Sequence, residues 1–368
     1  MKIFNRFCLA LLLAVVCLGA GAEGLSADGP YILYDSESTV QVIRVTSEGR
    51  IEKEEFDSLL AGFGFRVESH DGKYAFDVSL HRIERPEWRG KAPKKLFVMS
   101  DPHGDLDCMV GLLQANGVIG KKLEWRYGRN HLMVIGDVFD RGPDVTQIFW
   151  LLYKLEAEAA RAGGKVSFLL GNHEPMVLSN DLRYTDSKYK VLADSLGVEY
   201  ASLFSPDTEL GRWLGTRNTM QVIGSDLFVH AGLGKAFYDL NPDIPFVNRE
   251  MSRVLFKKNK LRKAYSPLYA FLYGSEGPIW YRGLVRTDEK YKPCAADTVQ
   301  LILNRYGVEH VIVGHTIFED VSTFYGDRVI GVNVANRKNR EQGRGRALLI
   351  EKGAYYVAGD KGKMRRLF

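Results

Sequence analysis

The middle of the chain repeats one pattern, in which a short apolar run ends in a cluster of polar residues and glycines. The apolar runs cover residues 96–99, 132–135, 166–170, 227–229 and 311–313. Continuous apolar runs of this length are typical of strands that are buried on both faces of a sheet. The pattern therefore predicts five core strands, each followed at its carboxyl end by polar side chains.

Helical patterns fill the intervals between these runs. Leu106, Val110 and Leu113 fall on one face of a helix. Asp105 and Asp144 stand at positions expected of helix N-caps. Strands that alternate with helices predict an α/β architecture, and sites in such sheets form beyond the carboxyl ends of the strands. We therefore expect the five polar clusters to converge on one crevice.

The regions that flank this pattern have a different character. Four short β-segments separated by turn signals are expected before residue 90, at residues 31–34, 40–45, 64–68 and 74–80. We predict a small β-rich extension over residues 23–90, which ends in a polar linker at 86–95, and a catalytic domain over residues 91–368. Residues 241–279 are partly helical in pattern and form a candidate cap. Closing strands are expected at residues 329–334, 347–351 and 355–358.

The first residues of the chain have the pattern of a targeting segment. Lys2 and Arg6 precede an apolar stretch at residues 7–18, and Ala20-Gly21-Ala22 offers a small-x-small cleavage site. The apolar stretch is shorter than the roughly 20 residues that a membrane span needs. We therefore predict a signal peptide over residues 1–22 rather than an uncleaved anchor. The mature protein is expected to be periplasmic or secreted, without stable membrane insertion.

Charge and cysteine content change this picture little. The formal charge of +5 falls to +3 without Lys2 and Arg6, which is too weak to indicate nucleic-acid binding. Cys108 and Cys294 remain after removal of the leader. An exported protein permits a disulfide between them, but two separate buried thiols are the default expectation.

The polar clusters contain donors for metal ions. They supply carboxylate, amide and imidazole groups but no thiolate, from Asp101, His103, Asp137, Asn172, His230 and His315. Mixed nitrogen and oxygen ligands suit Mn, Fe or Zn, and we favour Mn. A carboxylate can bridge two cations, and Asp137 is central in the set. Two such metal ions can clamp a phosphoryl group and supply a bridging hydroxide as the nucleophile.

Other residues of the clusters suit the remaining chemistry of phosphate hydrolysis. Arg141 and Arg282 are candidate phosphate ligands because guanidinium groups match phosphate oxygens in pairs. His173 is a candidate general acid for the leaving group, and the carboxylate of Asp140 can orient its imidazole and favour the protonated form. Glu174 is expected to support the ligands rather than to react.

The clusters together resemble the signature blocks of the phosphoprotein phosphatase branch of the calcineurin-like metallophosphoesterases. The blocks are Asp101-Pro102-His103-Gly104, Gly136-Asp137-Val138-Phe139-Asp140-Arg141-Gly142, Gly171-Asn172-His173-Glu174, His230-Ala231-Gly232 and Gly314-His315-Thr316. In addition, Trp280-Tyr281-Arg282-Gly283 is similar to the bacterial Shewanella-like protein phosphatases.

The resemblance implies both a fold and a set of residue roles. The implied fold is a central two-sheet β-sandwich flanked by helices. One metal ion would be held by Asp101, His103 and Asp137. The second would be held by Asp137, Asn172, His230 and His315. The phosphate would lie on Arg141 and Arg282, with His173 as the acid and Asp140 as its partner.

The sequence thus predicts a two-metal phosphatase that acts on phosphate monoesters. The expected substrate is a protein phosphorylated on tyrosine, serine or threonine, or a small phosphoester. A nucleotide polyphosphate or phosphodiester hydrolase with the same metal core is the alternative. A binding module without activity would have lost a ligand or His173, and this chain retains all of them. The sequence predicts no particular oligomeric state.

Overall fold

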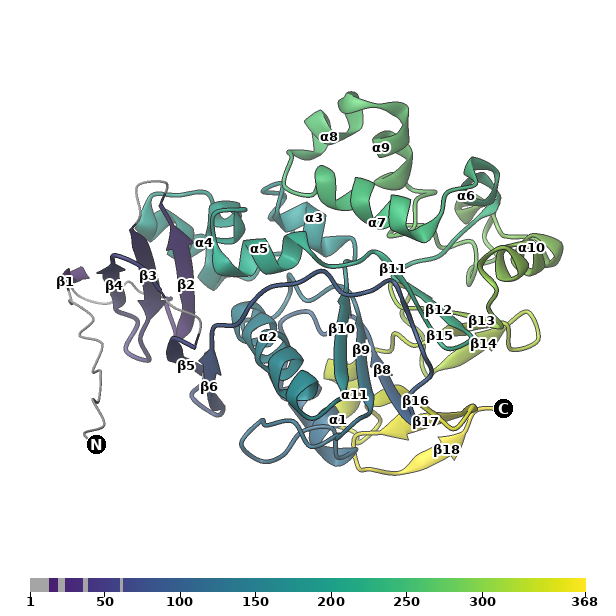
Figure 1. The fold of residues 1–368 in the computed structure, drawn as a ribbon, viewed down its shortest axis with the longest axis horizontal. Helices are drawn as coiled ribbons and strands as arrows, with labels where there is room; N and C mark the ends of the chain where they lie inside the picture. The colour runs from purple at the N-terminus through teal and green to yellow at the C-terminus, as the bar shows by residue number, and fades with distance from the viewer. Residues whose placement is uncertain (1–12, 19–23, 36–38, 60–61) are drawn as a thin grey trace, which may run out of the picture.

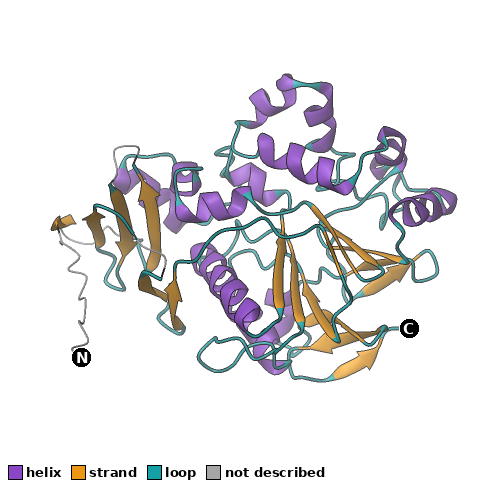
Figure 2. Cartoon of the chain, viewed as in Figure 1, coloured by secondary structure: helices purple, strands orange, loops and turns teal. Residues whose placement is uncertain are grey.

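The computed structural model describes residues 13–18, 24–35, 39–59 and 62–368. Two six-stranded sheets lie at its centre, helices cover their outer sides, and a smaller β-rich part lies at the N-terminal end (Figure 1, Figure 2). The predicted two-sheet sandwich flanked by helices is therefore confirmed.

The first central sheet contains the three expected strands that precede the first three polar clusters. Its order is β10-β9-β8-β16-β17-β18. Its strands are β8 (Lys95–Met99), β9 (His131–Ile135), β10 (Lys165–Leu169), β16 (Arg346–Glu351), β17 (Ala354–Gly359) and β18 (Met364–Arg366). β8, β9 and β10 run parallel, so their carboxyl ends meet at one edge. β16 joins β8 in the antiparallel direction.

The second central sheet contains the strands before the last two clusters. Its order is β14-β15-β13-β12-β11-β7. Its strands are β7 (Arg89–Gly90), β11 (Met220–Ile223), β12 (Asp226–Val229), β13 (His310–Val313), β14 (Ser322–Phe324) and β15 (Val329–Gly331). β12 and β13 are parallel. β7 lies in the segment 86–95 that we expected to be a plain linker. That expectation is wrong in this respect, because β7 pairs in parallel with β11.

The space between the two sheets is filled by apolar side chains from both. Val98 and Met133 of the first sheet belong to the same buried cluster as Phe228 and Ile312 of the second, and none of these four side chains is exposed. Fully burying a side chain of this kind contributes about 1.5–3 kcal/mol. This interior therefore fixes the position of each sheet relative to the other, and with it the ends of the strands that carry the polar clusters.

Helices α1 (Leu106–Ala115) and α2 (Val145–Arg161) follow the first two clusters and pack with the first sheet (Figure 1). Asp105 caps α1 as expected, because its side chain accepts from the backbone N–H of Cys108 at 3.0 Å. Asp144 stands at the start of α2 but makes no capping bond with its side chain. It accepts from the backbone N–H of His70 at 2.8 Å and lies 2.8 Å from the His70 ring.

The remaining helices are short. They are α3 (His173–Val177), α4 (Ser187–Leu196), η1 (Tyr200–Phe204), α5 (Glu209–Gly215), α6 (Lys235–Leu240), α7 (Ile244–Arg253), α8 (Asn259–Tyr265), α9 (Pro267–Leu272), η2 (Glu289–Tyr291), α10 (Ala296–Tyr306) and α11 (Asn336–Arg340). Within the ranges that the structure describes, no helix is both long and apolar enough to cross a bilayer.

The candidate cap segment, 241–279, contains α7, α8 and α9, which form the uppermost group of helices in Figure 1. Val247 and Leu272 of this segment are fully buried and share a core with Met220 and Leu227 of the second sheet. The partly helical pattern of the segment is thus confirmed. Its function as a cap stays a prediction.

The N-terminal part contains a four-stranded sheet of order β1-β4-β3-β2 and a two-stranded ladder of β5 and β6. The strands are β1 (Leu13–Leu18), β2 (Asp28–Tyr34), β3 (Val40–Val45), β4 (Ile51–Phe56), β5 (Gly64–Glu68) and β6 (Ala75–Ser79). β1 falls in the predicted leader and pairs with β4. The other leader residues, 1–12 and 19–22, lie outside the described residues, and leader cleavage stays a prediction.

This extension and helix α2 share one hydrophobic core. Trp150 of α2 is fully buried, and its indole N–H donates to the carbonyl of Pro30 at 2.9 Å. Phe65 packs edge-on against the same ring, with centroids 4.7 Å apart. Gln147 donates to the carbonyl of Glu68 at 2.9 Å. The extension is therefore packed firmly against the helix that follows the second polar cluster.

Candidate metal centre and active site

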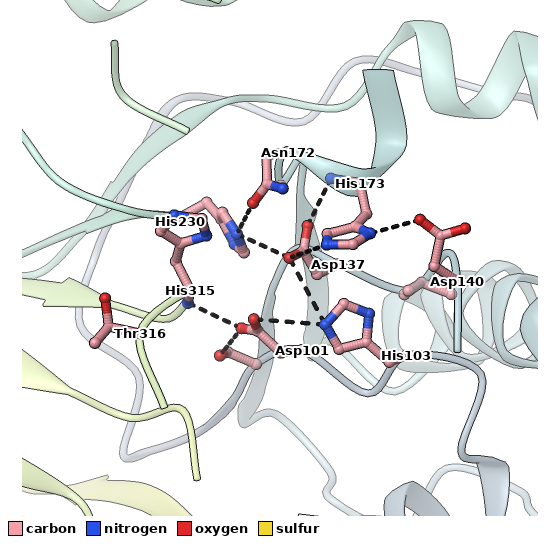
Figure 3. A network of polar contacts seen from close by, with 12 residues as sticks. Asp101, His103, Asp137, Asp140, Asn172, His173, His230, His315 and Thr316 are labelled. Carbon is pink, nitrogen blue, oxygen red and sulfur yellow. Dashed lines mark hydrogen bonds and ion pairs between the residues drawn. The ribbon is translucent and has the colours of Figure 1, made fainter. Parts of the chain in front are cut away.

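The five polar clusters converge on one place between the two sheets (Figure 3). Three come from the ends of β8, β9 and β10 in the first sheet, and two from the ends of β12 and β13 in the second. The structure brings together the following predicted site residues: Asp101, His103, Asp137, Asp140, Asn172, His173, His230 and His315.

Asp137 occupies the centre of the group. One carboxylate oxygen, Oδ2, lies 3.1 Å from Nε2 of His230, 3.8 Å from Nε2 of His103 and 3.9 Å from Nε2 of His173. The other oxygen accepts the backbone N–H of His173 at 2.9 Å. The Asp137 carboxylate thus faces imidazoles from both sheets, as a bridging ligand would.

Hydrogen bonds to backbone carbonyls orient two of these imidazoles. Nδ1 of His103 lies 2.9 Å from the carbonyl of Phe139, and Nδ1 of His230 lies 2.8 Å from that of Ile135. A carbonyl oxygen only accepts, so Nδ1 carries the hydrogen in both rings. Nε2 of each ring then points towards Asp137, which is the usual arrangement of metal-binding histidines.

Two buried nitrogen atoms at this centre, Nε2 of His103 and Nε2 of His315, make no hydrogen bond within the described part of the chain. A buried polar atom without a partner is costly, and a cation between the imidazoles and carboxylates would satisfy both atoms. The donor set therefore fits divalent metal ions.

The charges of the site support the same conclusion. Burial and the neighbouring Asp137 raise the pKa of Asp101 to about 6, although His230 opposes the shift. Burial lowers the pKa of His230, but Asp137 and Asp101 outweigh it and raise the pKa to about 9. Without cations, the centre must therefore hold protons to balance its buried carboxylates. Cations that displace these protons would restore the charged carboxylates and the free imidazole nitrogens that metal binding requires.

Two groups of ligand atoms lie close enough to hold one ion each, with their atoms within 4.8 Å of one another. They are His103, Asp137 and His173, and Asp137, His230 and His315. The shared Asp137 agrees with the predicted bridge. Asp101 lies at the edge of the first group, with Oδ2 3.9 Å from Nε2 of His103. Asn172 lies at the edge of the second, with Oδ1 3.1 Å from Nε2 of His230.

His173 forms a tight pair with Asp140. Nδ1 of His173 lies 2.5 Å from Oδ2 of Asp140, and both side chains are buried. Burial lowers the pKa of His173, but Asp137 and Asp140 outweigh it, so the net shift is upward. The hydroxyl of Thr185 donates to the second oxygen of Asp140 at 2.6 Å. Thr185 lies outside every polar cluster of the sequence, and no sequence signal marked it.

The two predicted phosphate ligands lie beside different residues of the centre. Arg141 follows Asp140 and lines a cavity beside Asp101 and His103. Arg282 lies beside His315, and its guanidinium donates to the hydroxyl of Thr316 at 3.0 Å. Burial lowers the pKa of Arg282. The cluster of ligands is therefore flanked by one guanidinium from each half of the sandwich.

Glu174 supports the loop that carries Asp137, as the sequence predicted. Its fully buried carboxylate accepts backbone N–H groups from Asp137 at 3.0 Å, Val138 at 2.8 Å and Gly171 at 2.6 Å. Burial and Asp137 raise the pKa of Glu174 to about 7. Because all of these partners are donors, the hydrogen bonds favour the ionised carboxylate against that shift.

The backbone at the site adopts conformations that side chains other than glycine seldom take. Six site residues have positive φ: Asp101 (51°), His103 (43°), Asp137 (57°), Asp140 (72°), Arg141 (71°) and His315 (59°). Such angles cost free energy, and they persist only where the surrounding structure enforces them. Here they turn the chain sharply after β8, β9 and β13, where the polar side chains of these clusters converge on one centre.

The other histidines and the cysteines have structural surroundings. His131 is buried and lies 2.9 Å from the hydroxyl of Ser167, and His310 pairs with Asp226 at 3.0 Å. Both lie at the start of their strands, at the opposite end from the metal ligands. Cys108 and Cys294 are free and buried, so the default expectation of two separate thiols is confirmed.

Fold and site together define a class of protein. Residues 94–318 match the family model of the calcineurin-like phosphoesterases, and the chain belongs to this family. The family implies divalent metal ions, for which the residues described above provide the ligands.

Comparison with individual proteins shows which members of the family this chain is similar to. Shewanella-like protein phosphatase 2 of Arabidopsis thaliana is 27% identical over 310 residues, which cover 72% of this chain and 77% of the plant protein. Shewanella-like protein phosphatase 1 of Plasmodium berghei is 27% identical over 239 residues, or 64% of each chain. The cold-active protein tyrosine phosphatase of a psychrophilic Shewanella species has a solved structure with a TM-score of 0.79 and 28% identity, which covers 93% of this chain and 99% of that one. The predicted similarity to the Shewanella-like group is thus confirmed.

Proposed function

We propose that this protein is a two-metal phosphatase that hydrolyses phosphate monoesters of phosphorylated proteins or small molecules. The observation that carries the proposal is the His173–Asp140 pair, which lies beside the cluster of buried ligands around Asp137. The leaving group of a phosphate monoester is an alkoxide or a phenoxide. A protonated imidazole at this position can donate the proton that this leaving group needs.

Each predicted residue has a role in this proposal. Asp140 holds the His173 imidazole in orientation and favours its protonated form, and Thr185 fixes Asp140 in turn. Arg141 and Arg282 bind the phosphoryl oxygens from two sides through paired hydrogen bonds. Glu174 holds the backbone around Asp137 rigid, so the ligands stay in place without reorganisation.

Two divalent ions complete the site, and we favour Mn over Fe or Zn. Asp101, His103 and Asp137 would hold one ion, and Asp137, Asn172, His230 and His315 the other. His173 lies close enough to His103 and Asp137 to be a ligand of the first ion as well. When bound, such ions activate water at neutral pH and stabilise the charge of the phosphoryl group.

Monoester hydrolysis is favoured by relatives that align over more of this chain than the nucleotide hydrolase named below. The Arabidopsis and Plasmodium relatives carry the name of protein phosphatases, and the Shewanella structure is that of a protein tyrosine phosphatase. Nucleotide polyphosphate or phosphodiester hydrolysis is the second candidate. A symmetrical bis(5'-nucleosyl)-tetraphosphatase of Legionella pneumophila supports it, with 26% identity over 195 residues, or 52% of this chain.

Two model substrates separate these functions. After chelation and restoration with Mn, Zn or Fe, we expect the mature protein to hydrolyse p-nitrophenyl phosphate much faster than bis-p-nitrophenyl phosphate. Turnover of a dinucleoside tetraphosphate is measured beside them. Activity on the diester or the tetraphosphate alone would establish the second candidate. Absence of turnover with every metal would contradict both.

We further propose that the protein works in the periplasm of a bacterium or is secreted. The proposal rests on the leader pattern at residues 1–22. Mass spectrometry of the expressed protein is expected to find an N-terminus at Glu23. An intact N-terminus on protein in the soluble cytosolic fraction would contradict the proposal.

A further inference from the structure

A pocket of about 160 Å³ lies between α3 and the helices of segment 241–279. Its inner end is formed by Asn172, a predicted metal ligand, and by Trp280, whose ring lies edge-on to that of His315 with centroids 5.7 Å apart. Pro175 and Met176 of α3 form an apolar wall. The pocket is smaller than the roughly 300–1,000 Å³ of sites that enclose a whole small ligand, so it has room for one side chain of a larger one. None of the roles proposed above uses it.

Helix α8, which lies above α3 in Figure 1, closes the outer end of this pocket. Asn259, Arg262 and Lys263 line the pocket, at the spacing of one helix face. The Arg262 guanidinium is buried and donates to the carbonyls of Leu255 at 2.7 Å and Lys257 at 2.8 Å. Among the described residues, no carboxylate pairs with it. Buried cations are usually paired with an acid, so the chain leaves a positive charge beside the pocket without neutralising it.

The positive charge of the chain is concentrated around α8. Residues 251–275 contain no aspartate or glutamate and six cations, which are Arg253, Lys257, Lys258, Lys260, Arg262 and Lys263. This segment therefore carries +6, whereas the chain without its predicted leader carries +3, so the rest of the chain carries −3. Within the described ranges, only Arg253 and Lys258 of the six form ion pairs, with Glu250 and Glu199. A surface of one sign beside a cleft raises the local concentration of ligands of the opposite sign.

Two exposed apolar side chains accompany these lysines. Leu261 and Tyr265 are exposed over 62% and 65% of their surface and stand four residues apart on α8, so they share a face. The ammonium of Lys257 lies 5.8 Å from the centre of the Tyr265 ring. Exposed apolar groups that lie together mark contact sites for proteins or membranes. A membrane surface could cover Leu261 and Tyr265 but could not enter the pocket at Lys263, whereas a polypeptide can occupy both.

We propose that α8 and the pocket beside it bind an acidic segment of a phosphoprotein substrate, next to its phosphorylated residue. The inference rests on the proposed phosphatase function and specifies its substrates as proteins with carboxylates close to the phosphorylated residue. With the phosphate at the metal centre, an extended segment advances about 3.3 Å per residue towards α8. One glutamate or aspartate side chain enters the pocket against Met176 and Trp280, with its carboxylate at Lys263. A further carboxylate meets Lys260, and apolar neighbours cover the exposed apolar pair of α8.

The test removes two charges from α8 and compares this change with a matched removal elsewhere. Lys260→Gln/Lys263→Gln replaces two exposed lysines of α8. Lys121→Gln/Lys122→Gln, in the exposed loop between α1 and β9, lowers the net charge equally and is the control. The substrates are phosphopeptides of one sequence, with glutamate or with glutamine on both sides of the phosphorylated residue. Each pair is made with phosphotyrosine and with phosphoserine, and kcat/KM is measured on metal-restored protein.

The unmodified protein and the control are expected to hydrolyse the glutamate peptide with about three- to tenfold higher kcat/KM than the glutamine peptide, because a few exposed ion pairs and local charge act together. Lys260→Gln/Lys263→Gln is expected to lose most of this ratio. The ratio in the unmodified protein should also shrink in about 0.5 M salt, which screens exposed charges. Equal kcat/KM values for the two peptides in the unmodified protein would overturn the inference, as would an unchanged ratio in the α8 variant.

Two further measurements separate this inference from its neighbours. Sedimentation with vesicles of anionic phospholipid tests a membrane as the partner. Vesicle binding that is lost in the α8 variant, together with equal hydrolysis of the two peptides, would assign α8 to a membrane surface instead. Fluorescence anisotropy measures binding of labelled glutamate and glutamine peptides that carry no phosphate. If no variant hydrolyses any monoester but the glutamate peptide still binds more tightly, the proposed function fails and the docking surface stands.

Discussion

Replacement of Asp137 by Asn is expected to remove metal from the protein and to lower phosphatase turnover by about 10³-fold or more. Asp137 is the one residue shared by both groups of ligand atoms, so its loss affects both ions at once. Asn is nearly the same size and keeps one oxygen for the backbone N–H of His173. It lacks the charge that attracts the cations. Elemental analysis after dialysis, together with p-nitrophenyl phosphate turnover, measures both effects.

The fold itself supplies a matched control. Asp226 and His310 form another aspartate–histidine pair, partly buried and 3.0 Å apart, at the opposite end of β12 and β13 from the metal ligands. Asp226→Asn removes a buried carboxylate from the second sheet but leaves the site intact. We expect it to keep its metal and its turnover. A full metal content in Asp137→Asn would contradict the bridging role.

Replacement of His173 by Asn is expected to leave the metal content intact and to slow the hydrolysis of alkyl phosphates by about 10²- to 10⁴-fold. Turnover of p-nitrophenyl phosphate should fall far less, because nitrophenolate leaves with little need of a proton. The ratio of the two losses reports on proton donation, which a general weakening of the site would not change.

This variant also decides between two uses of His173. Its Nε2 lies 3.9 Å from Oδ2 of Asp137, within one of the groups that can hold an ion. Loss of one metal ion from His173→Asn would make the residue a ligand. Equal losses on alkyl and nitrophenyl esters would argue against it as the acid. His310→Asn, which alters the distant pair, is the control and is expected to change neither measurement.

The sequence predicted the centre of the fold and the site well because both depend on local patterns. The five core strands are continuous apolar runs, and each is followed directly by its polar cluster, so parallel pairing within each sheet and the packing of the two sheets bring the clusters together. The residues of β8, β9, β10, β12 and β13 agree with the expected runs to within one residue at each end.

Features that depend on distant partners could not be predicted. β4 has the sequence Ile-Glu-Lys-Glu-Glu-Phe, which carries no strand pattern, and it forms because β3 and β1 provide hydrogen-bond partners on both sides. Thr185 contacts Asp140 across 45 residues. Asp144 does not make its expected capping bond because its carboxylate accepts a hydrogen bond from His70 of the extension instead. In each case the decisive neighbour is remote in sequence.

The positive φ angles at the site could not be predicted from the sequence either. Positive φ is uncommon for any residue other than glycine, and although Asp and His adopt it more often than most, nothing in the local sequence of Asp101 or His315 requires it. Contacts with distant residues hold these turns. For example, the backbone N–H of His315 in one half of the sandwich donates to the carboxylate of Asp101 in the other half at 3.1 Å. A motif can therefore identify the ligands while the geometry that aims them remains a property of the assembled sandwich.

The division of the ligands between the two sheets has a consequence for the stability of the protein. The loops after β8 and β9 belong to one half of the sandwich, and His230 and His315 belong to the other. An ion held by Asp137 together with these two histidines fastens the halves to each other. Because an ion that binds only the folded chain shifts the unfolding equilibrium by mass action, resistance to heat becomes a function of free metal concentration. Metal scarcity would then limit the lifetime of the folded protein as well as its turnover.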